Sequence, residues 1–223
     1  MEKSEQLYFE MPNLRLLGIQ DYIITNSNNL AFDLILRIYK DKEVIGIISG
    51  PPYSGKSHLC KILLDLMSDK RCLLVDKIQD NLLNKINSND LIIIENIDTV
   101  KFDSSEENLF HIINIVRQNK KKLLLTSRTP IASIDIDLKD LRSRLDAIFE
   151  AKIKEPDDKL MEYIIVKIFN DRQITANPKI VSYLMKRLDR SYEGINKFLD
   201  LIDNFSLEKG KRISIKLISE YLG

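Results

Sequence analysis

One loop of eight residues restricts the fold of this chain more than any other stretch. The loop fits the spacing G-x-x-x-x-G-K-[ST] and consists of Gly50, Pro51, Pro52, Tyr53, Ser54, Gly55, Lys56 and Ser57. It follows the apolar run 44–49 and precedes a helical pattern over 58–67. A strand, such a loop and a helix in that order form a phosphate-binding P-loop. The sequence therefore predicts a phosphate site within an α/β fold.

The residues of this loop have distinct chemical roles. Gly50 and Gly55 permit backbone conformations in which several N–H groups point at one anion, and the following helix adds its positive end. Lys56 would contact the outer phosphates, and the Ser57 hydroxyl would hold Mg²⁺. We include His58, the next residue of the helix, in the binding site. A glycine-rich turn with an unrelated lysine is the alternative, and it would leave the match at every defining position to chance.

Charge and hydropathy exclude several classes of protein. The 34 basic and 33 acidic residues leave a formal net charge of +1, so nothing global favours wrapping nucleic acid or binding an anionic membrane. Cys60 and Cys72 are isolated in apolar surroundings, which indicates reduced core thiols. There is no apolar run long enough for a signal sequence or a membrane span, so we expect a cytoplasmic protein.

Short apolar runs alternate with helical patterns along the first two thirds of the chain, which is typical of a parallel sheet covered on both faces. The expected strands are 44–49, 72–76, 91–95, 122–126 and 148–153. The expected helices are 30–40, 56–68, 78–87, 106–118 and 138–145. Ser27 or Asn28 is the expected N-cap of the first helix.

The run Glu155-Pro156-Asp157-Asp158 interrupts this alternation, because Pro156 suits a linker or a helix start. The later segments have the apolar spacing of helices and cover 157–170, 178–188, 191–205 and 214–222. The sequence thus predicts an arm over 1–20, an α/β base over 21–155 and a small helical unit over 156–223.

The amino-terminal arm carries an alternating apolar pattern. Leu7, Phe9 and Met11 would line one side of a strand-like peptide. Such a peptide could dock in a groove of a partner or pack on its own domain, and the pattern alone leaves both open.

Polar side chains follow two of the buried strands. Glu95 would help to hold Mg²⁺, and the next residue, Asn96, stands where P-loop NTPases usually orient the attacking water. An amide cannot take a proton from water, so hydrolysis by this chain should be slow unless Asp98 substitutes. Thr126 or Ser127 could sense the terminal phosphate, or either could cap the loop into Thr129 and Pro130.

Two basic clusters lie outside the P-loop. Arg142 and Arg144 close a predicted helix, where they would be either ordinary solvated side chains or an arginine finger for a neighbouring subunit. The run Lys120-Lys121-Lys122 would be either solvated or a local DNA contact, and solvation is the commoner case.

Taken in order, these motifs resemble the AAA+ part of the DnaA family of bacterial replication initiators, and most of all its short regulators of the Hda (HdaA) type. The resemblance covers essentially the whole chain. It rests on the P-loop, the pair Glu95-Asn96, and the runs 123–130, 140–145 and 188–192.

The resemblance implies a fold and a ligand. It implies a five-stranded parallel sheet in the order 5-1-4-3-2, followed by a small helical lid. It also implies ATP or ADP with Mg²⁺ as the bound cofactor. The stretch 22–29 resembles the part of the family that lines the adenine pocket, through Tyr22, Ile23, Ile24 and Asn28.

The resemblance also implies catalytic positions, and the sequence differs from the family's pattern at two of them. Arg144 falls on the position of a finger that acts in trans, and Thr126 or Ser127 falls on the first sensor. Glu193 replaces the lid arginine of the second sensor, although Arg190 and Lys197 are within a helical turn. Because the catalytic acid is also replaced, by Asn96, nucleotide would be structural or regulatory here.

The same resemblance implies a binding partner for the amino-terminal arm. Gln6, Leu7, Phe9 and Met11 resemble the peptide with which Hda and many replication proteins bind the sliding clamp, the beta subunit of DNA polymerase III. DNA would then be contacted only indirectly, through the clamp.

Together these features predict a clamp-bound AAA+ regulator of replication initiation that promotes hydrolysis of ATP bound to DnaA. A self-contained ATPase of the helicase-loader type, which could form a homo-oligomer, is one alternative. A non-hydrolysing clamp adaptor is the other.

Overall fold

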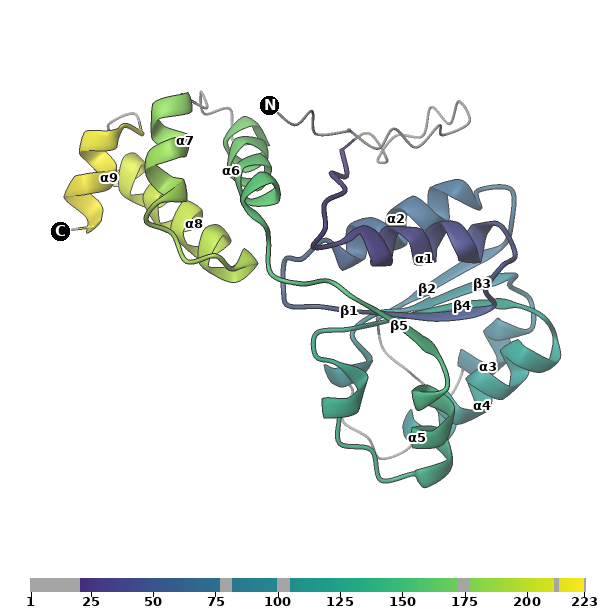
Figure 1. The fold of residues 1–223 in the computed structure, drawn as a ribbon. Helices are drawn as coiled ribbons and strands as arrows, with labels where there is room; N and C mark the ends of the chain where they lie inside the picture. The colour runs from purple at the N-terminus through teal and green to yellow at the C-terminus, as the bar shows by residue number, and fades with distance from the viewer. Residues whose placement is uncertain (1–20, 77–81, 100–104, 172–176, 211–212, 223) are drawn as a thin grey trace, which may run out of the picture.

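The computed structural model describes residues 21–76, 82–99, 105–171, 177–210 and 213–222 (Figure 1). Within these residues, one parallel sheet is built from β1 (Ile45–Ser49), β2 (Cys72–Val75), β3 (Leu91–Ile94), β4 (Lys122–Ser127) and β5 (Phe149–Lys152). Its order is β2-β3-β4-β1-β5, which confirms the predicted order 5-1-4-3-2. The predicted strand ends agree to within one residue.

Helices cover both faces of this sheet (Figure 1). The helices α1 (Asn29–Tyr39) and α2 (Lys56–Leu66) lie on one face. The other face carries α3 (Leu82–Ile86), α4 (Ser105–Gln118) and α5 (Lys139–Asp146), together with the short turns η1 (Ile97–Thr99) and η2 (Ile131–Ser133). Part of the predicted helix 78–87 falls outside the described residues.

The burial of β1 explains why this layering forms. Side chains alternate along a strand, so Ile48 packs with α1 and α2 while Ile45 and Ile47 pack with α4 and α5. All residues of β1 are buried, as expected for the interior of a parallel sheet. The loop that follows β1 is therefore held on a rigid strand.

After β5 the described chain is helical. The helices α6 (Asp158–Asp171), α7 (Pro178–Met185), α8 (Tyr192–Lys209) and α9 (Ile215–Leu222) form a separate lobe beside the sheet (Figure 1), as the sequence predicts. This lobe, here called the lid, has a hydrophobic core of its own. Leu160 and Tyr192 instead belong to the core between the sheet and α1 and α2, so they attach the lid to the base.

The predicted N-cap position of α1 is confirmed at Asn28, but the Asn28 side chain makes no capping hydrogen bond to the helix. Asn28 stands at the N-cap position, but its amide accepts a hydrogen bond from Thr25 N at 2.8 Å and donates one to Ile23 O at 2.9 Å. The Ser27 hydroxyl binds Asp157 instead, accepting from the Asp157 amide at 3.0 Å and donating to its carboxylate at 3.1 Å. Both side chains thus organise the stretch before α1 rather than its first turn.

The basic run before β4 is mostly committed to the fold. Lys121 donates to the carbonyls of Asn87 and Asn89, and Lys122 binds the carbonyl of Ile38 and the carboxylate of Asp41. Lys120 is exposed. These contacts favour a structural role for the run over the alternative of a DNA contact.

Three further sequence expectations have mixed outcomes. Cys60 and Cys72 are both free, but only Cys60 is buried, and burial raises the pKa of its thiol. Among the described helices, none is long and apolar enough to cross a membrane. The proposed clamp motif in the arm lies outside the described residues.

Candidate functional site

The loop between β1 and α2 lies at the carboxyl edge of the sheet, where ligands of open α/β folds bind. Gly55 precedes α2 with φ +91°, a left-handed conformation, and a Cβ there would come within 3.2 Å of the Tyr22 ring. A Cβ on Gly50 would come within 2.9 Å of Ile153 Cβ. Both glycines are therefore required by the geometry that the sequence motif predicts.

The Lys56 side chain lies within this loop. Its ammonium donates to the carbonyls of Gly50 at 2.6 Å and Pro51 at 2.8 Å, and the residue is only 7% exposed. Burial lowers the pKa of Lys56, Asp98 opposes that shift, and Arg128 adds to it. Asp98 and Arg128 therefore lie close enough to act on the loop, and the Asp98 carboxylate accepts from the Arg128 amide at 2.9 Å.

The two predicted magnesium ligands are in direct contact. The Ser57 hydroxyl donates to the Glu95 carboxylate at 2.5 Å, so the start of α2 faces the end of β3. Among the described residues, no group of three His, Cys, Asp or Glu side chains could hold a metal ion by itself. Two oxygen donors fit Mg²⁺, which usually keeps its remaining positions for water and phosphate oxygen. Ser57 and Glu95 would therefore hold Mg²⁺ together with a bound nucleotide.

Thr126 and Ser127 differ in what their hydroxyls do. The pairing of Ile94 with Leu125 brings the end of β3 beside Thr126, whose oxygen accepts from the Asn96 amide at 2.9 Å. Ser127 donates to the Thr129 carbonyl at 2.5 Å and accepts from the Thr129 amide at 3.2 Å. Ser127 therefore caps the loop, whereas the fully buried Thr126 hydroxyl holds the Asn96 backbone at the end of β3.

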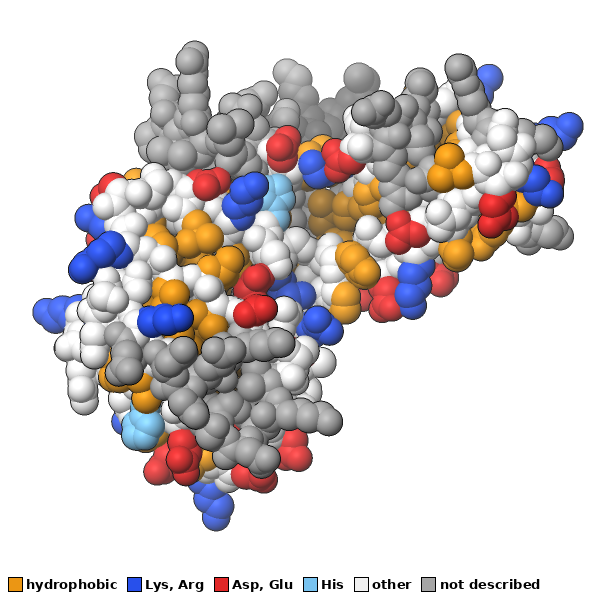
Figure 2. Space-filling model, turned by 180° about the vertical axis from the view of Figure 1, so that it is seen from behind, with side chains coloured by type: hydrophobic (Ala, Val, Ile, Leu, Met, Phe, Trp, Pro, Cys, Tyr) orange, Lys and Arg blue, Asp and Glu red, His pale blue; other side chains and the backbone are white. Residues whose placement is uncertain are grey.

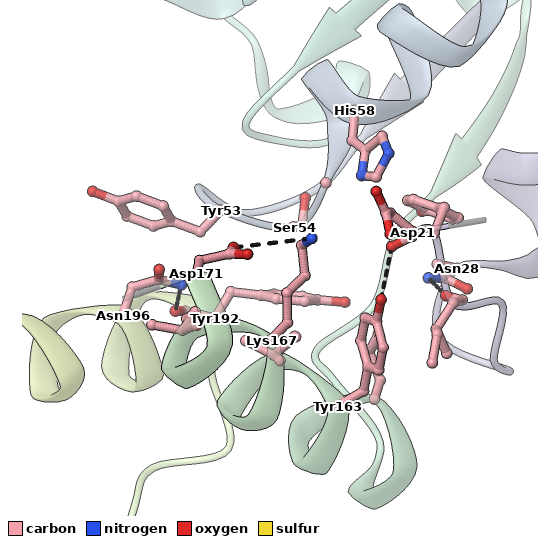
Figure 3. Close-up of a pocket in the computed structure, with 16 residues that line it drawn as sticks. Asp21, Asn28, Tyr53, Ser54, His58, Tyr163, Lys167, Asp171, Tyr192 and Asn196 are labelled. Atoms are coloured by element: carbon pink, nitrogen blue, oxygen red, sulfur yellow. Dashed lines mark hydrogen bonds and ion pairs between the residues drawn. The ribbon is translucent and has the colours of Figure 1, made fainter. Parts of the chain in front are cut away.

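A cleft of about 220 Å³ opens beside the P-loop (Figure 3), where the base and the lid meet. Figure 2 shows the molecule hollowed between these two parts, with hydrophobic side chains in the hollow. The cleft is lined by Tyr22, Ile23 and Asn28 of the predicted adenine stretch, by Tyr53, Ser54, Gly55 and His58 of the loop and α2, and by side chains of α6 and α8. Ile24 does not line it and instead packs against the base core.

Aromatic side chains form the inner wall of the cleft. The Tyr22 ring stacks on Phe32 with centroids 5.9 Å apart and meets the His58 ring edge-on at 5.3 Å. Tyr192 enters from the first turn of α8 and is 2% exposed. Burial raises the pKa of both tyrosines, so their hydroxyls remain protonated donors.

The two basic lid residues near the second-sensor position each form an ion pair with an acidic residue. Glu193 binds Lys197 at 2.6 Å, and Arg190 binds Asp158 at 3.0 Å. The basic side chain that lines the cleft is Lys167 of α6, with Asp171 at 3.9 Å as its partner. The sequence analysis did not single out Lys167, because no motif around this residue indicates that α6 lies beside the P-loop.

The structure separates the two candidate finger residues. Arg142 donates to the carbonyls of Ile131 and Ile134 and pairs with Asp146, so it holds η2 against α5. Arg144 is exposed, and its side chain makes no hydrogen bond or ion pair with another described residue. Since α5 runs from the carboxyl end of β4 toward the amino end of β5, its last turn lies toward the edge of the sheet away from the P-loop. Arg144 is thus exposed on the side of the sheet away from the P-loop.

No protein-family model matches the sequence. Domain III of the replication initiation protein DnaA from Thermotoga maritima is similar in structure, with a TM-score of 0.74 and 16% identity over 89% of this chain and 92% of that chain. DnaA from Aquifex aeolicus bound to AMPPCP gives 0.69 and 18% over 82% and 64%. The RuvB Holliday junction branch migration motor from Thermotoga maritima gives 0.66 and 15% over 91% and 70%.

The sheet order, the P-loop and the helical lid define the fold of an AAA+ P-loop NTPase. Within that class the chain resembles both the initiator DnaA and the motor RuvB in structure. At these low identities the likeness establishes the fold and leaves the activity to be argued from the site.

Proposed function

We propose that this chain is a nucleotide-binding regulator of the Hda type, which promotes hydrolysis of ATP held by the replication initiator DnaA. The observation that carries this proposal is the contrast between Arg142, which is tied into the fold, and Arg144, which is exposed and unpaired among the described residues. An exposed arginine without an ion-pair partner can offer its charge to the phosphates of another subunit, as an arginine finger does. The DnaA-like fold supports DnaA as that subunit.

The chain's own nucleotide site supports a regulatory role for ATP or ADP. Lys56 and the backbone of the loop would bind the phosphates, while Ser57 and Glu95 would hold Mg²⁺. Bound Mg²⁺ supplies charge neutralisation between phosphate groups. Asn96 offers an amide where a proton acceptor is needed, so the chain would hold nucleotide longer than it hydrolyses it.

The proposal includes the sliding clamp as a second partner. Gln6, Leu7, Phe9 and Met11 would bind the beta subunit of DNA polymerase III, and DNA would be reached through that clamp. This arrangement would confine the activity to the cytoplasmic replication machinery. A clamp held on DNA would also raise the local concentration of the regulator near its substrate.

A self-contained ATPase is a second candidate, favoured by one observation. Asp98 acts electrostatically on Lys56, so a carboxylate that could accept a proton lies near the P-loop. Hydrolysis would then proceed in this chain and could drive its own assembly, in a homo-oligomer.

One assay separates these functions. ATP bound to DnaA is followed to ADP with the chain alone, with clamp loaded on DNA, and with both. The regulator predicts rapid hydrolysis only with both, and negligible turnover by the chain alone. Robust turnover by the isolated chain that disappears in Lys56→Ala would establish the ATPase instead. Clamp binding without any stimulation would leave only the adaptor.

A further inference from the structure

The helix α5, which carries Arg144, has little apolar surface with which to pack on the base. Of its eight residues, Leu141 and Leu145 are buried. Two buried side chains one turn apart fix a helix less firmly than a full apolar face does, so polar contacts carry more of its placement. One of these contacts is made by Arg142, which binds the carbonyls of Ile131 and Ile134.

A second polar contact lies at the start of α5 and comes from Glu106. One oxygen of its carboxylate accepts from the Asp137 amide at 3.1 Å, and the other accepts from the Leu138 amide at 2.7 Å. Leu138 is the N-cap residue of α5, where a negative charge also interacts favourably with the helix dipole. Glu106 is 8% exposed, and a buried carboxylate needs such hydrogen bonds to offset its lost hydration.

Glu106 is itself held on a firm support. It stands in the first turn of α4, which lies on the same face of the sheet as α5 (Figure 1). The helix α4 has four apolar side chains in the core that also contains Leu141 and Leu145, namely Leu109, Ile112, Ile113 and Val116. The Glu106 carboxylate therefore ties the beginning of α5 to a helix that is anchored along its length.

We infer that Glu106 is a positioning residue for Arg144, because it fixes the first turn of α5 and so sets where the guanidinium stands. This inference rests on the proposed function and adds the residue that orients the finger. The Arg144 side chain has no hydrogen bond or ion pair with another described residue, so its place depends on the helix that carries it. A misplacement of about 1 Å can reduce the rate of a catalysed step by about 10²-fold, so a small shift of α5 is enough.

The test replaces Glu106 with Gln, which has the same shape but exchanges one acceptor oxygen for an NH₂ group that cannot accept. Single-turnover hydrolysis of DnaA-bound ATP, with clamp loaded on DNA, is measured over a range of chain concentrations. Glu106→Gln should lower the maximal rate by about 10- to 100-fold and leave the half-saturating concentration unchanged. Glu107→Gln, an exposed change in the same turn of α4, is the matched control and should behave like the parent.

Two further measurements separate positioning from general damage to the fold. If Glu106 acts through Arg144, Glu106→Gln should change nothing more in an Arg144→Ala background. In the isolated chain, the amides of 137–144 should exchange hydrogen faster in Glu106→Gln than in the parent or in Glu107→Gln. Glu106→Asp keeps the charge on a shorter side chain, and it should lower the maximal rate in the same way if Glu106→Gln does not fold.

The outcomes distinguish this inference from the proposed function. A parental maximal rate in Glu106→Gln, when Arg144→Ala loses stimulation, would overturn the inference and leave the function standing. A further loss in the double variant, or a raised half-saturating concentration at an unchanged maximal rate, would also overturn it. Absence of stimulation by the parent would overturn the proposed function and the inference with it.

Discussion

Lys56 binds two carbonyl groups of its own loop, so its ammonium is already positioned where the motif needs a cation. Charge-assisted hydrogen bonds are roughly twice as strong as neutral ones, and a phosphate would form them with this group. Burial lowers the pKa of Lys56, because the ammonium has lost part of its hydration inside the loop. The Lys56 ammonium is thus fixed within the loop, at the position where a phosphate would bind.

Lys56→Ala should weaken nucleotide binding by about ten- to a hundredfold, the equivalent of about 1.5–3 kcal/mol for hydrogen bonds to a charged group. Calorimetric titration with ADP measures this loss. Lys61→Ala, on the exposed side of the same helix, is the control and should bind like the parent. Unchanged affinity in Lys56→Ala would refute the phosphate site.

A second prediction concerns the substitution of Asn96 by aspartate. Its φ of +54° lies in the left-handed region that aspartate also tolerates, and its contact with Thr126 is made by the backbone. Asn96→Asp should therefore fold normally and supply a proton acceptor, raising the chain's own ATP turnover by up to about 10²–10⁴-fold. Steady-state phosphate release measures the effect. No increase would mean that the side chain does not face the attacking water.

At the scale of elements, the junction between β5 and α6 is fastened to the stretch before α1. Ser27 O accepts from the Lys154 amide at 2.9 Å, and the Ser27 hydroxyl exchanges two hydrogen bonds with Asp157. Asp157 in turn accepts from the Leu160 amide at 2.9 Å and so caps α6. One stretch therefore lines the cleft and orients the first lid helix.

Ser27→Ala should destabilise the protein by about 1 kcal/mol or somewhat more, because it leaves Asp157 with fewer partners. Burial alone would raise the pKa of Asp157, but hydrogen bonds from Leu160, Thr25 and Ser27 outweigh it and lower the pKa. A lowered carboxyl pKa gives stability that is present above the unfolded value of about 3.9 and lost as the pH falls through the folded value.

Urea unfolding at about pH 7 and about pH 3 tests this account. The parent should lose more stability in acid than Ser27→Ala does, since the variant has less of this contribution to lose. Ser182→Ala, an exposed change on α7, should match the parent at both values. An equal acid dependence in the parent and Ser27→Ala would contradict the role of the Ser27–Asp157 contact.

The sequence predicts elements better than it predicts contacts between them. The strands and the P-loop follow from local patterns, since a buried run and a glycine-rich loop determine their own geometry. The choice between Arg142 and Arg144 depends on where η2 packs, and the place of Tyr192 in the wall of the cleft depends on how α8 docks. Asn28 has a good capping side chain but finds better partners in Thr25 and Ile23. Tertiary packing decides all of these cases, and local sequence does not encode it.

At the scale of the whole molecule, the arm is proposed as a tether that is separate from the folded base. Replacing Gln6, Leu7 and Phe9 with Ala should abolish binding to the sliding clamp and leave the melting temperature nearly unchanged. Glu2→Ala with Glu5→Ala changes the same arm outside residues 6–11 and is the control. Surface plasmon resonance on immobilised clamp measures binding. Loss of folding in the triple variant would show that the arm belongs to the core.

Arg144 carries the central claim, because it is the part of this chain that would act on another protein's nucleotide. A finger supplied in trans accelerates phosphoryl transfer by about 10³–10⁵-fold, whereas an exposed arginine contributes little to stability. Arg144→Ala should therefore fold, bind nucleotide and bind clamp like the parent. Lys139→Ala removes an exposed positive charge from the same helix and is the matched control.

The most direct test is single-turnover hydrolysis of DnaA-bound ATP in the presence of clamp loaded on DNA, comparing the parent, Arg144→Ala and Lys139→Ala. The account predicts that the parent and Lys139→Ala accelerate hydrolysis equally and that Arg144→Ala loses nearly all of the acceleration, by about 10³-fold or more. Full stimulation by Arg144→Ala would contradict the account.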